Sequence, residues 1–178
     1  AYQLAKASQE IKRDLETVML ANQGRDAGTS NSTPRKMASL LSWIKTNSSV
    51  GSGGADPTTI GVSTRTDGTQ RTFTETLLKT VVAEVFTSGG SPKILMVGAS
   101  GKQKVSSFAG IAAQRFVTDA TPTTIISAAD AYLSDFGLIQ IVPNRFMRTR
   151  DALVLDPEYA ALAYLRPFTT NELAKTGD

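Results

Sequence analysis

Apolar residues recur at spacings of three and four along residues 2–23, which predicts a helix with one narrow apolar stripe. Gly24 follows directly and is a typical helix ending. Such a helix would be about 33 Å long, from the usual rise per residue. It is either a core helix of a compact domain or a rod that lies along another surface. Its stripe contains Leu4, Ala7, Ile11, Leu15, Val18 and Met19.

A second, shorter helix is predicted after a polar connector over residues 25–33. Thr33-Pro34 supplies an N-cap and a first-turn proline for a helix over residues 35–46. Trp43 lies beside the apolar face of this helix. A single Trp is usually a packing residue, in a core or at an interface, rather than a ligand platform. The apolar face is formed by Met37, Leu40, Leu41 and Ile44.

A long connection over residues 47–71 has almost no apolar periodicity. It contains Gly51-Ser52-Gly53-Gly54 and the turn signals Asp56-Pro57 and Asp67-Gly68. A connection of this length in a compact domain is either a mobile surface loop or a functional one. Two interpretations therefore stay open: a mobile loop, and a loop that a neighbouring subunit orders.

A helix, a strand and a further helix are predicted next. Residues 72–75, Thr-Phe-Thr-Glu, match a capping box, and the apolar helix after them stops at Gly89-Gly90. Residues 93–97 have the composition of a buried strand, and residues 102–114 that of a helix. The inward residues of the second helix are Val105, Phe108, Ile111 and Ala112.

The turn Gly98–Lys102 follows a strand and leads into a helix, as a phosphate-binding loop does. The Walker spacing would need Gly where Met96 stands, and Ser or Thr where Gln103 stands. A structural strand-to-helix turn is therefore the stronger interpretation. The alternative is a nucleotide-binding or enzymatic α+β domain that uses Gly98–Lys102.

The C-terminal part is predicted as a meander of short strands. Residues 131–134 and 138–142 are apolar runs linked by Asp135-Phe136-Gly137, with Gly where a positive φ is needed, so they form a hairpin. Pro143-Asn144 ends the second of these strands. The third and fourth strands of the meander are expected over residues 152–155 and 160–165. Upstream of the meander, short strands are expected over residues 115–117 and 123–127, with a turn over residues 119–122.

Composition narrows the possible functions. The chain has no Cys and no His, which removes disulfides, thiolate and imidazole chemistry and the usual general base. The carboxylates show no metal-ligand spacing, so we expect no catalytic, cofactor-binding or metal site. No apolar run approaches the ~20 residues that span a bilayer, and we expect no membrane partner.

The net charge of +3 is small and uneven. Residues 1–47 hold seven Lys and Arg against four Asp and Glu, whereas residues 48–101 hold four of each kind and residues 102–178 eight of each. The whole excess therefore lies in the predicted N-terminal helices. A dedicated nucleic-acid-binding protein would carry a much denser basic patch.

The order helix, helix, long loop, helix, strand, helix and then strands predicts an α+β fold. We expect three parts: residues 1–47 with the long and the short helix, the Gly/Ser/Thr-rich long loop of residues 48–71, and a mixed helix and sheet domain over residues 72–178. The predicted helix starts at the beginning of the chain, which lacks an initiator Met. We therefore expect a piece of a longer protein.

Short motifs form an ordered set over nearly the whole chain. They are Arg35-Lys36-Met37, Trp43–Asn47, Gly101–Lys104, Phe136-Gly137, Val142–Arg145 with Met147, Val154–Pro157, Leu165-Arg166-Pro167 and Leu173–Asp178. This set resembles the C-terminal half of a tailed-phage major capsid protein. It is most similar to the SU-ten-like major head protein family, with its Hong-Kong-ninety-seven-type capsid fold.

The resemblance implies a structural protein that self-assembles as pentamers and hexamers into an icosahedral phage or prophage head. The long helix would be the spine helix of the peripheral domain, and residues 72–178 the axial domain. The subunit would be part of the virion, assembled in the bacterial host cytoplasm. Packaged DNA would be held non-specifically, and scaffold or decoration proteins are possible further partners. Another virion or surface structural module is the remaining alternative.

Subunit contacts are expected on the long helix and on the turn after Pro143-Asn144. Arginine is favoured at interfaces because its guanidinium binds carboxylates through two hydrogen bonds. An ordinary solvated turn would have the same sequence, so that interpretation stays open. The candidate interface residues are Arg13, Glu16, Arg35, Trp43, Arg145, Arg148 and Arg150.

Overall fold

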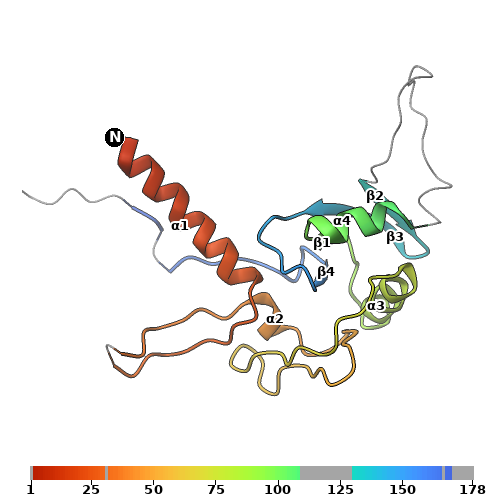
Figure 1. The fold of residues 1–178 in the computed structure, drawn as a ribbon, viewed down its shortest axis with the longest axis horizontal. Helices are drawn as coiled ribbons and strands as arrows, with labels where there is room; N and C mark the ends of the chain where they lie inside the picture. The colour runs from red at the N-terminus through yellow and green to blue at the C-terminus, as the bar shows by residue number, and fades with distance from the viewer. Residues whose placement is uncertain (1, 31, 109–129, 166, 170–178) are drawn as a thin grey trace, which may run out of the picture.

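The computed structural model describes residues 2–30, 32–108, 130–165 and 167–169. Over these residues helices combine with a four-stranded sheet, which confirms the predicted α+β class (Figure 1). In chain order the elements are α1 (Tyr2–Leu20), α2 (Leu40–Trp43), α3 (Glu75–Thr87), β1 (Ile94–Val97), α4 (Ala99–Ser106), β2 (Ala131–Ser134), β3 (Gly137–Pro143) and β4 (Ala152–Leu155).

The strands lie in the order β2-β3-β1-β4. β2 and β3 form an antiparallel hairpin, whereas β1 is parallel to β3 and antiparallel to β4. The predicted meander is therefore wrong, because β1 comes from far upstream and inserts between β3 and β4. Its sequence Ile-Leu-Met-Val is apolar on both faces, which is typical of a central strand.

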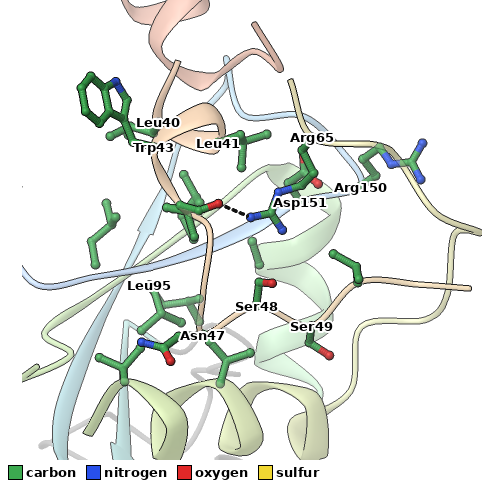
Figure 2. Close-up of a pocket in the computed structure, with 18 of the residues that line it drawn as sticks. Leu40, Leu41, Trp43, Asn47, Ser48, Ser49, Arg65, Leu95, Arg150 and Asp151 are labelled. Atoms are coloured by element: carbon green, nitrogen blue, oxygen red, sulfur yellow. Dashed lines mark hydrogen bonds between the residues drawn. The ribbon is translucent and has the colours of Figure 1, made fainter. Parts of the chain in front are cut away.

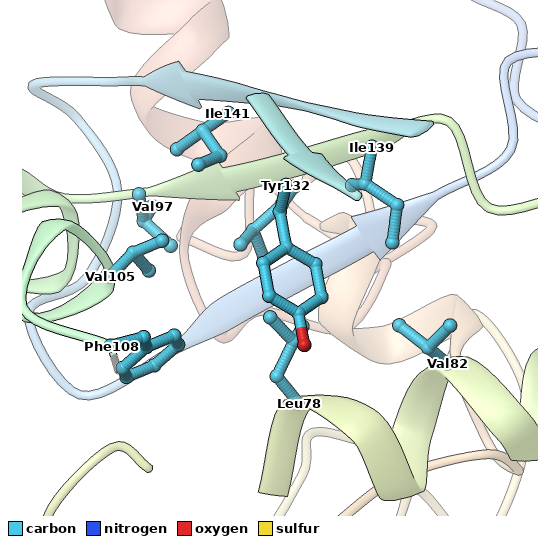
Figure 3. Close-up of a cluster of buried hydrophobic side chains, with 9 residues drawn as sticks. Leu78, Val82, Val97, Val105, Phe108, Tyr132, Ile139 and Ile141 are labelled. Atoms are coloured by element: carbon cyan, nitrogen blue, oxygen red, sulfur yellow. The ribbon is translucent and has the colours of Figure 1, made fainter. Parts of the chain in front are cut away.

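The main core lies between one face of the sheet and helices α3 and α4 (Figure 3). Strand alternation directs Leu95 and Val97 of β1 and Ile139 of β3 to this face, where all three are fully buried. The helical side of the core contains Leu78, Val82 and Val105, with Phe108 just after α4.

Tyr132 of β2 belongs to the same core, and its hydroxyl group lies at the edge of this core. Its hydroxyl donates a hydrogen bond to Glu75 Oε1 over 3.0 Å. Burial, together with this hydrogen bond, raises the pKa of Tyr132 to about 12. The phenol therefore stays neutral and keeps donating to the carboxylate over the whole physiological pH range.

A second apolar cluster covers the opposite face of the sheet at β1 and β4. It joins Leu20 of α1, Leu41 of α2, Met147 and Leu153, with Met96 half-buried against them. This cluster attaches the C-terminal end of α1 to the sheet. The part of the same face that belongs to β2 and β3 lies outside the cluster.

The long helix is confirmed in kind but ends earlier than predicted, at Leu20 rather than at residue 23. The Gln23 N–H donates to Ser39 Oγ at 3.0 Å, and the Ser39 N–H donates to the Gln23 carbonyl at 2.8 Å. These bonds take the backbone of Gln23 away from the helical ladder. Buried Ser39, rather than Gly24, therefore explains the early ending.

The second predicted helix is largely wrong: of residues 35–46, only Leu40–Trp43 are helical. Upstream, residues 26–36 form an arm in which the chain doubles back on itself: Asp26 and Lys36 exchange two backbone hydrogen bonds, each of 3.0 Å. Thr33-Pro34 lies within this doubled-back arm and does not cap a helix. Backbone pairing thus replaces the helical turns that local propensity favoured.

α3 confirms the predicted helix but not its capping box. Thr74, not Thr72, is the N-cap residue, and its Oγ1 accepts a hydrogen bond from the Leu77 N–H at 3.4 Å. Glu75 therefore occupies the first helical position and cannot reach back to the cap. Its carboxylate pairs instead with Lys79, at 2.9 Å, and accepts the bond from Tyr132.

α4 begins and ends earlier than the predicted helix over residues 102–114. It spans Ala99–Ser106, and the backbone N–H groups of Ser107 and Phe108 close its last turn. The inward positions of Val105 and Phe108 are confirmed. Residues 109–114, and the strands and turn expected over residues 115–127, lie outside the described residues.

The C-terminal strands are confirmed except for the last one. Gly137 has a φ of +127° and stands opposite Ser134, so the link between the strands is Asp135-Phe136. β3 ends at Pro143 and β4 has the predicted bounds. Residues 160–165 are wrong as a strand: they are exposed, and among the described residues no strand lies beside them to pair with.

Candidate subunit interface

α1 is uncovered over most of its length. Its residues are exposed up to Asp14, and Leu4 of the apolar stripe is 50% exposed. Burial begins at Leu15 and is nearly complete at Leu20. Figure 1 shows the first turns of the helix pointing away from the sheet. The first half of the stripe is therefore available to another surface.

A polar contact joins α1 to the end of β3. Asn144 Nδ2 donates to Glu16 Oε1 over 2.6 Å, while Asn144 Oδ1 accepts from the Phe146 N–H at 2.8 Å. The Asn144 N–H donates to the Val97 carbonyl at 2.8 Å. One asparagine thus connects the helix, the end of β1 and the turn after β3. The structure places the candidate residue Glu16 at this internal contact.

Trp43 is 58% exposed, although it belongs to a helix whose other face is buried. Figure 2 shows its ring on the outer side of α2, away from Leu41. Gly61 lies under the ring, since a Cβ at Gly61, which has a φ of +73°, would be 3.1 Å from it. The indole therefore has one face on the backbone and the rest toward solvent. Arg13, Arg35 and Arg145 are also exposed, on α1, the arm and the turn after β3.

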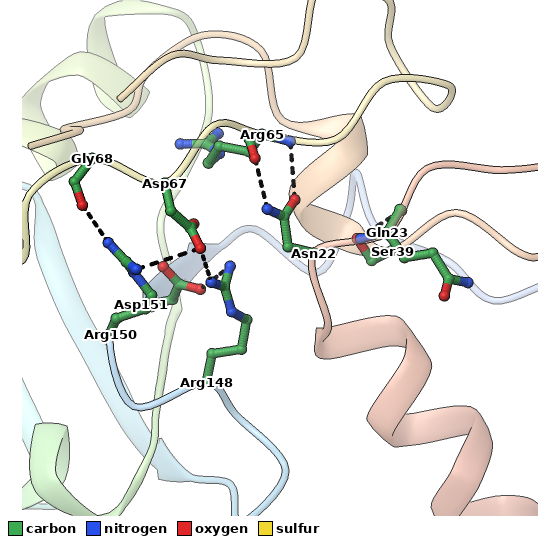
Figure 4. Close-up of polar contacts among 9 residues, drawn as sticks. All are labelled: Asn22, Gln23, Ser39, Arg65, Asp67, Gly68, Arg148, Arg150 and Asp151. Atoms are coloured by element: carbon green, nitrogen blue, oxygen red, sulfur yellow. Dashed lines mark hydrogen bonds and ion pairs between the residues drawn. The ribbon is translucent and has the colours of Figure 1, made fainter. Parts of the chain in front are cut away.

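The other two arginines of that turn, Arg148 and Arg150, are paired with groups of the same chain (Figure 4). Arg148 forms an ion pair with Asp67, and its Nη1 lies 3.0 Å from Asp151 Oδ2. Arg150 donates to the Gly68 carbonyl and lies 3.4 Å from the Asp67 carboxylate. Asp67 and Gly68 belong to the long loop. The charges therefore join the long loop to the turn.

The two carboxylates beside Arg148 have different environments. The hydrogen bond from Arg148 lowers the pKa of Asp67, and the positive charges of Arg148 and Arg150 act in the same direction. Burial raises the pKa of Asp151, although Arg148 opposes this effect. Asp67 is thus the carboxylate that most firmly keeps its negative charge between the two arginines.

The long loop is also attached to α1 and α2. Asn22 Nδ2 donates to the Arg65 carbonyl at 2.6 Å, and the Arg65 N–H donates to Asn22 Oδ1 at 2.9 Å (Figure 4). The Arg65 guanidinium donates to the Ile44 carbonyl at 2.9 Å and pairs with Asp56 at 3.0 Å. These contacts come from the chain's own residues. Ordering of the loop by a neighbouring subunit stays a prediction.

A groove of about 1530 Å³ lies between the long loop, α2, α3 and β4 (Figure 2). Val81 and Val85 of α3 and Leu153 of β4 supply apolar lining, and Ser48 and Arg65 of the long loop supply polar lining. A recess this wide offers an extended surface rather than a close fit around a small molecule.

The Gly98–Lys102 turn is built as a structural turn. Gly98 is the residue before α4, and a Cβ at Gly101 would meet the Val97 side chain at 3.0 Å. Lys102 Nζ pairs with Asp130 at 3.0 Å, with only 17% of the lysine side chain exposed. The cation that a phosphate would need is therefore already bound to a carboxylate.

Two further observations concern metal binding and membrane insertion. Over the part of the chain that the structure describes, no three acidic side chains gather in a way that could hold a metal ion. No described helix combines the length and apolar character needed to cross a bilayer.

Comparison with known proteins identifies the family. A search among curated proteins finds no match. The model of the family described as SU10 major capsid protein matches residues 1–178, the whole of the chain. Its match agrees with a subunit that has an uncovered helical stripe. The chain belongs to the SU10 major capsid protein family.

Proposed function

We propose that copies of this chain associate as pentamers and hexamers around the symmetry axes of an icosahedral head. The role of a structural major capsid subunit, which self-assembles and encloses DNA, follows from the family. The observation that supports extensive subunit contacts is the uncovered apolar stripe of α1. In a closed shell each weak contact is repeated by symmetry, so modest contacts become cooperative.

The proposed arrangement assigns a place in the shell to each part of the chain. α1 acts as the spine helix of the peripheral domain within residues 1–47, and residues 72–178 form the axial domain nearest the symmetry axes. The long loop of residues 48–71 connects the two. The main core supports the axial part of this division, since all its members lie within residues 72–178, whereas the second cluster joins α1 and α2 to Met147 and Leu153 of that part.

The candidate interface residues divide by what they contact within the chain. Arg13, Arg35, Trp43 and Arg145 are exposed, so we propose that they contact neighbours directly. Arg148 and Arg150 contact Asp67, and Glu16 contacts Asn144. These three residues would contribute by fixing the shape of the surface that Arg145 and α1 present.

Packaged DNA would be held by confinement rather than by a dedicated site. The net charge of +3 gives little non-specific affinity, and its location in residues 1–47 suits a weak contact with phosphates. Assembly would take place in the host cytoplasm, with scaffold or decoration proteins as additional partners. A nucleotide-binding function at Gly98–Lys102 is less favoured, because Lys102 is paired with Asp130.

Electron microscopy of the full-length protein, with any scaffold present, tests the proposal. We expect closed particles built from pentamers and hexamers. A full-length protein that stays monomeric at high concentration would contradict it.

Two alanine variants distinguish a residue that contacts neighbouring subunits from one that only fixes the shape of the contact surface. Arg145→Ala should leave the circular dichroism and unfolding of the free subunit unchanged but reduce particle yield. Arg148→Ala should lower subunit stability as well, because it leaves Asp67 and Asp151 facing each other without their shared cation. Equal stability loss in both variants would refute this division.

A further inference from the structure

Four large apolar side chains are exposed on the β2–β3 hairpin or beside it. Leu133 and Leu138 stand opposite each other across the hairpin and are 59% and 63% exposed. Phe136 in the turn lies against Phe86 at the end of α3, with ring centroids 4.7 Å apart, and both rings are exposed. The two phenylalanines lie on the α3 side of the sheet, so we call only the cross-strand pair Leu133 and Leu138 the hairpin patch.

The register of the sheet explains why this patch is open. Tyr132 and Ile139 face the main core, so Leu133 and Leu138 must point to the opposite face. Among the described residues, the second cluster covers that face at β1 and β4 and does not reach β2. A face exposed to water normally carries polar residues, and a cross-strand pair of leucines there indicates a surface that becomes covered.

A second exposed apolar group lies at α2. Trp43 is flanked by Ile60 and Val62, which stand on either side of the Gly61 backbone that supports its ring. All three side chains are exposed. We call them the tryptophan patch.

The charges beside the hairpin patch are acidic. Asp135 is exposed in the turn of the hairpin, and residues 131–143 contain no Lys or Arg. Lys79 of α3 is close enough for Asp135 to raise its pKa, but Lys79 is already paired with Glu75 at 2.9 Å. Among the described residues, Asp135 has no ion-pair partner of its own, so its negative charge is exposed at the hairpin tip.

The charges beside the tryptophan patch are basic. Lys45 is exposed, and its Nζ donates to the Thr58 carbonyl at 3.0 Å, close to Ile60 in the chain. The Arg25 N–H donates to the Gly61 carbonyl at 3.1 Å, which places a second basic residue beside the patch. An apolar patch with an acidic neighbour and one with basic neighbours are complementary in charge and in character.

We infer that the hairpin patch of one subunit docks on the tryptophan patch of a neighbouring copy. This inference rests on the proposed capsid function, which makes a second copy the partner. The hairpin is at the β2 edge of the sheet, whereas α2 packs at the β4 edge, so the two patches lie on opposite sides of the domain. Each copy therefore offers one patch to each of two neighbours, and such a head-to-tail contact generates a ring when its rotation closes, as in a pentamer or hexamer.

Charge exchange tests the pairing of these two surfaces. In the full-length protein, Asp135→Lys and Lys45→Glu should each raise the protein concentration needed for particle formation by about tenfold, because each places like charges together. The double variant Asp135→Lys/Lys45→Glu restores opposite charges and should assemble close to the wild-type concentration. A double variant that assembles as poorly as the sum of the two single variants would overturn the inference.

Apolar truncation gives an independent measurement. Leu133→Ser/Leu138→Ser should abolish or strongly delay particle formation while the free subunit keeps its circular dichroism spectrum. Leu162→Ser is the matched control, since Leu162 is exposed outside both patches and should assemble normally. If the wild type forms particles and the hairpin variant forms them equally well, the proposed contact is refuted but the proposed function is not. A wild type that forms no particles would instead refute the proposed function.

Discussion

Arg148 is paired with two carboxylates, one distant in the sequence and one local: Asp67 belongs to the long loop, and Asp151 stands three residues after Arg148, before β4. All three side chains are partly buried, so their attraction is less screened by water than that of an exposed pair. Arg150 adds a second cation on the same Asp67 carboxylate. One aspartate thus holds the long loop against two arginines.

Asp67→Asn should lower the free energy of unfolding by about 1 kcal/mol at neutral pH, since it keeps the size of the side chain but removes its charge. The folded-state pKa of Asp67 is lowered, so its contribution is present above the unfolded value of about 3.9 and is lost as pH falls through the folded pKa. The difference between wild type and variant should therefore shrink in strongly acidic solution.

Urea unfolding of the free subunit at several pH values measures this difference. Asp14→Asn is a suitable control, because Asp14 is exposed on α1 and should show almost no effect. A difference between wild type and Asp67→Asn that stays constant from neutral to strongly acidic pH would argue against the ion pair as its source.

The sequence identified the arginines of this cluster but not their partners. Arg145, Arg148 and Arg150 stand close together in the sequence, so their positive charge is visible as a local pattern. Asp67-Gly68 has the pattern of an ordinary turn, and nothing in its neighbourhood indicates which cation it meets. Pairing between residues so far apart depends on the folded chain, and a single sequence carries no local signal for it.

Elements were predictable where a short-range pattern decides them. Turn chemistry sets the hairpin with Gly137, and β1 and β4 are short continuous apolar runs bounded by turn residues. The helix predicted over residues 35–46 was largely wrong, because backbone pairing to another segment outweighs a weak helix propensity. The strand predicted over residues 160–165 was wrong for the opposite reason: a run with strand propensity forms a strand only when a neighbouring strand pairs with it.

Gly24, after the end of α1, provides a test of how tightly the long loop approaches this helix. A Cβ at Gly24 would lie 1.8 Å from the Val62 carbonyl oxygen, and that oxygen belongs to backbone that cannot rotate away. Gly24→Ala should therefore lower the free energy of unfolding by about 2 kcal/mol or more. Thermal or urea unfolding measures the loss.

The control for this substitution is Gly98→Ala. Gly98 is also buried, but its nearest neighbour to an added Cβ is the Met147 carbonyl oxygen at 3.4 Å, an ordinary contact. We expect a loss below about 1 kcal/mol there, mostly from the helix N-cap position. Similar losses at both glycines would mean that the long loop does not press against Gly24 in solution.

At the scale of the whole molecule, α1 is fixed at one end only. Leu20 is buried in the second cluster, while Leu4, near the other end of the same helix, is half exposed. The helix therefore contributes differently to the stability of the subunit and to its association with other copies.

The same substitution at the two ends should separate these contributions. Leu20→Ala should lower the free energy of unfolding of the free subunit by about 3 kcal/mol, because it leaves a cavity in the cluster. Leu4→Ala should change it by less than about 0.5 kcal/mol but reduce particle yield. Urea unfolding and electron microscopy measure the two effects, and a destabilising Leu4→Ala would mean that the free subunit already covers the stripe.

The central position of β1 has a consequence for synthesis on the ribosome. β1 pairs with β3 on one edge and β4 on the other, so neither partner exists when Val97 has just been made. At typical translation speeds the roughly 60 residues up to Leu155 take about 3–12 s. Until Pro143 has been made the apolar Ile-Leu-Met-Val segment has no strand partner, and until Leu155 has been made one of its edges stays unpaired. An apolar strand exposed in this way favours aggregation of the nascent chain unless the ribosome or a chaperone shields it.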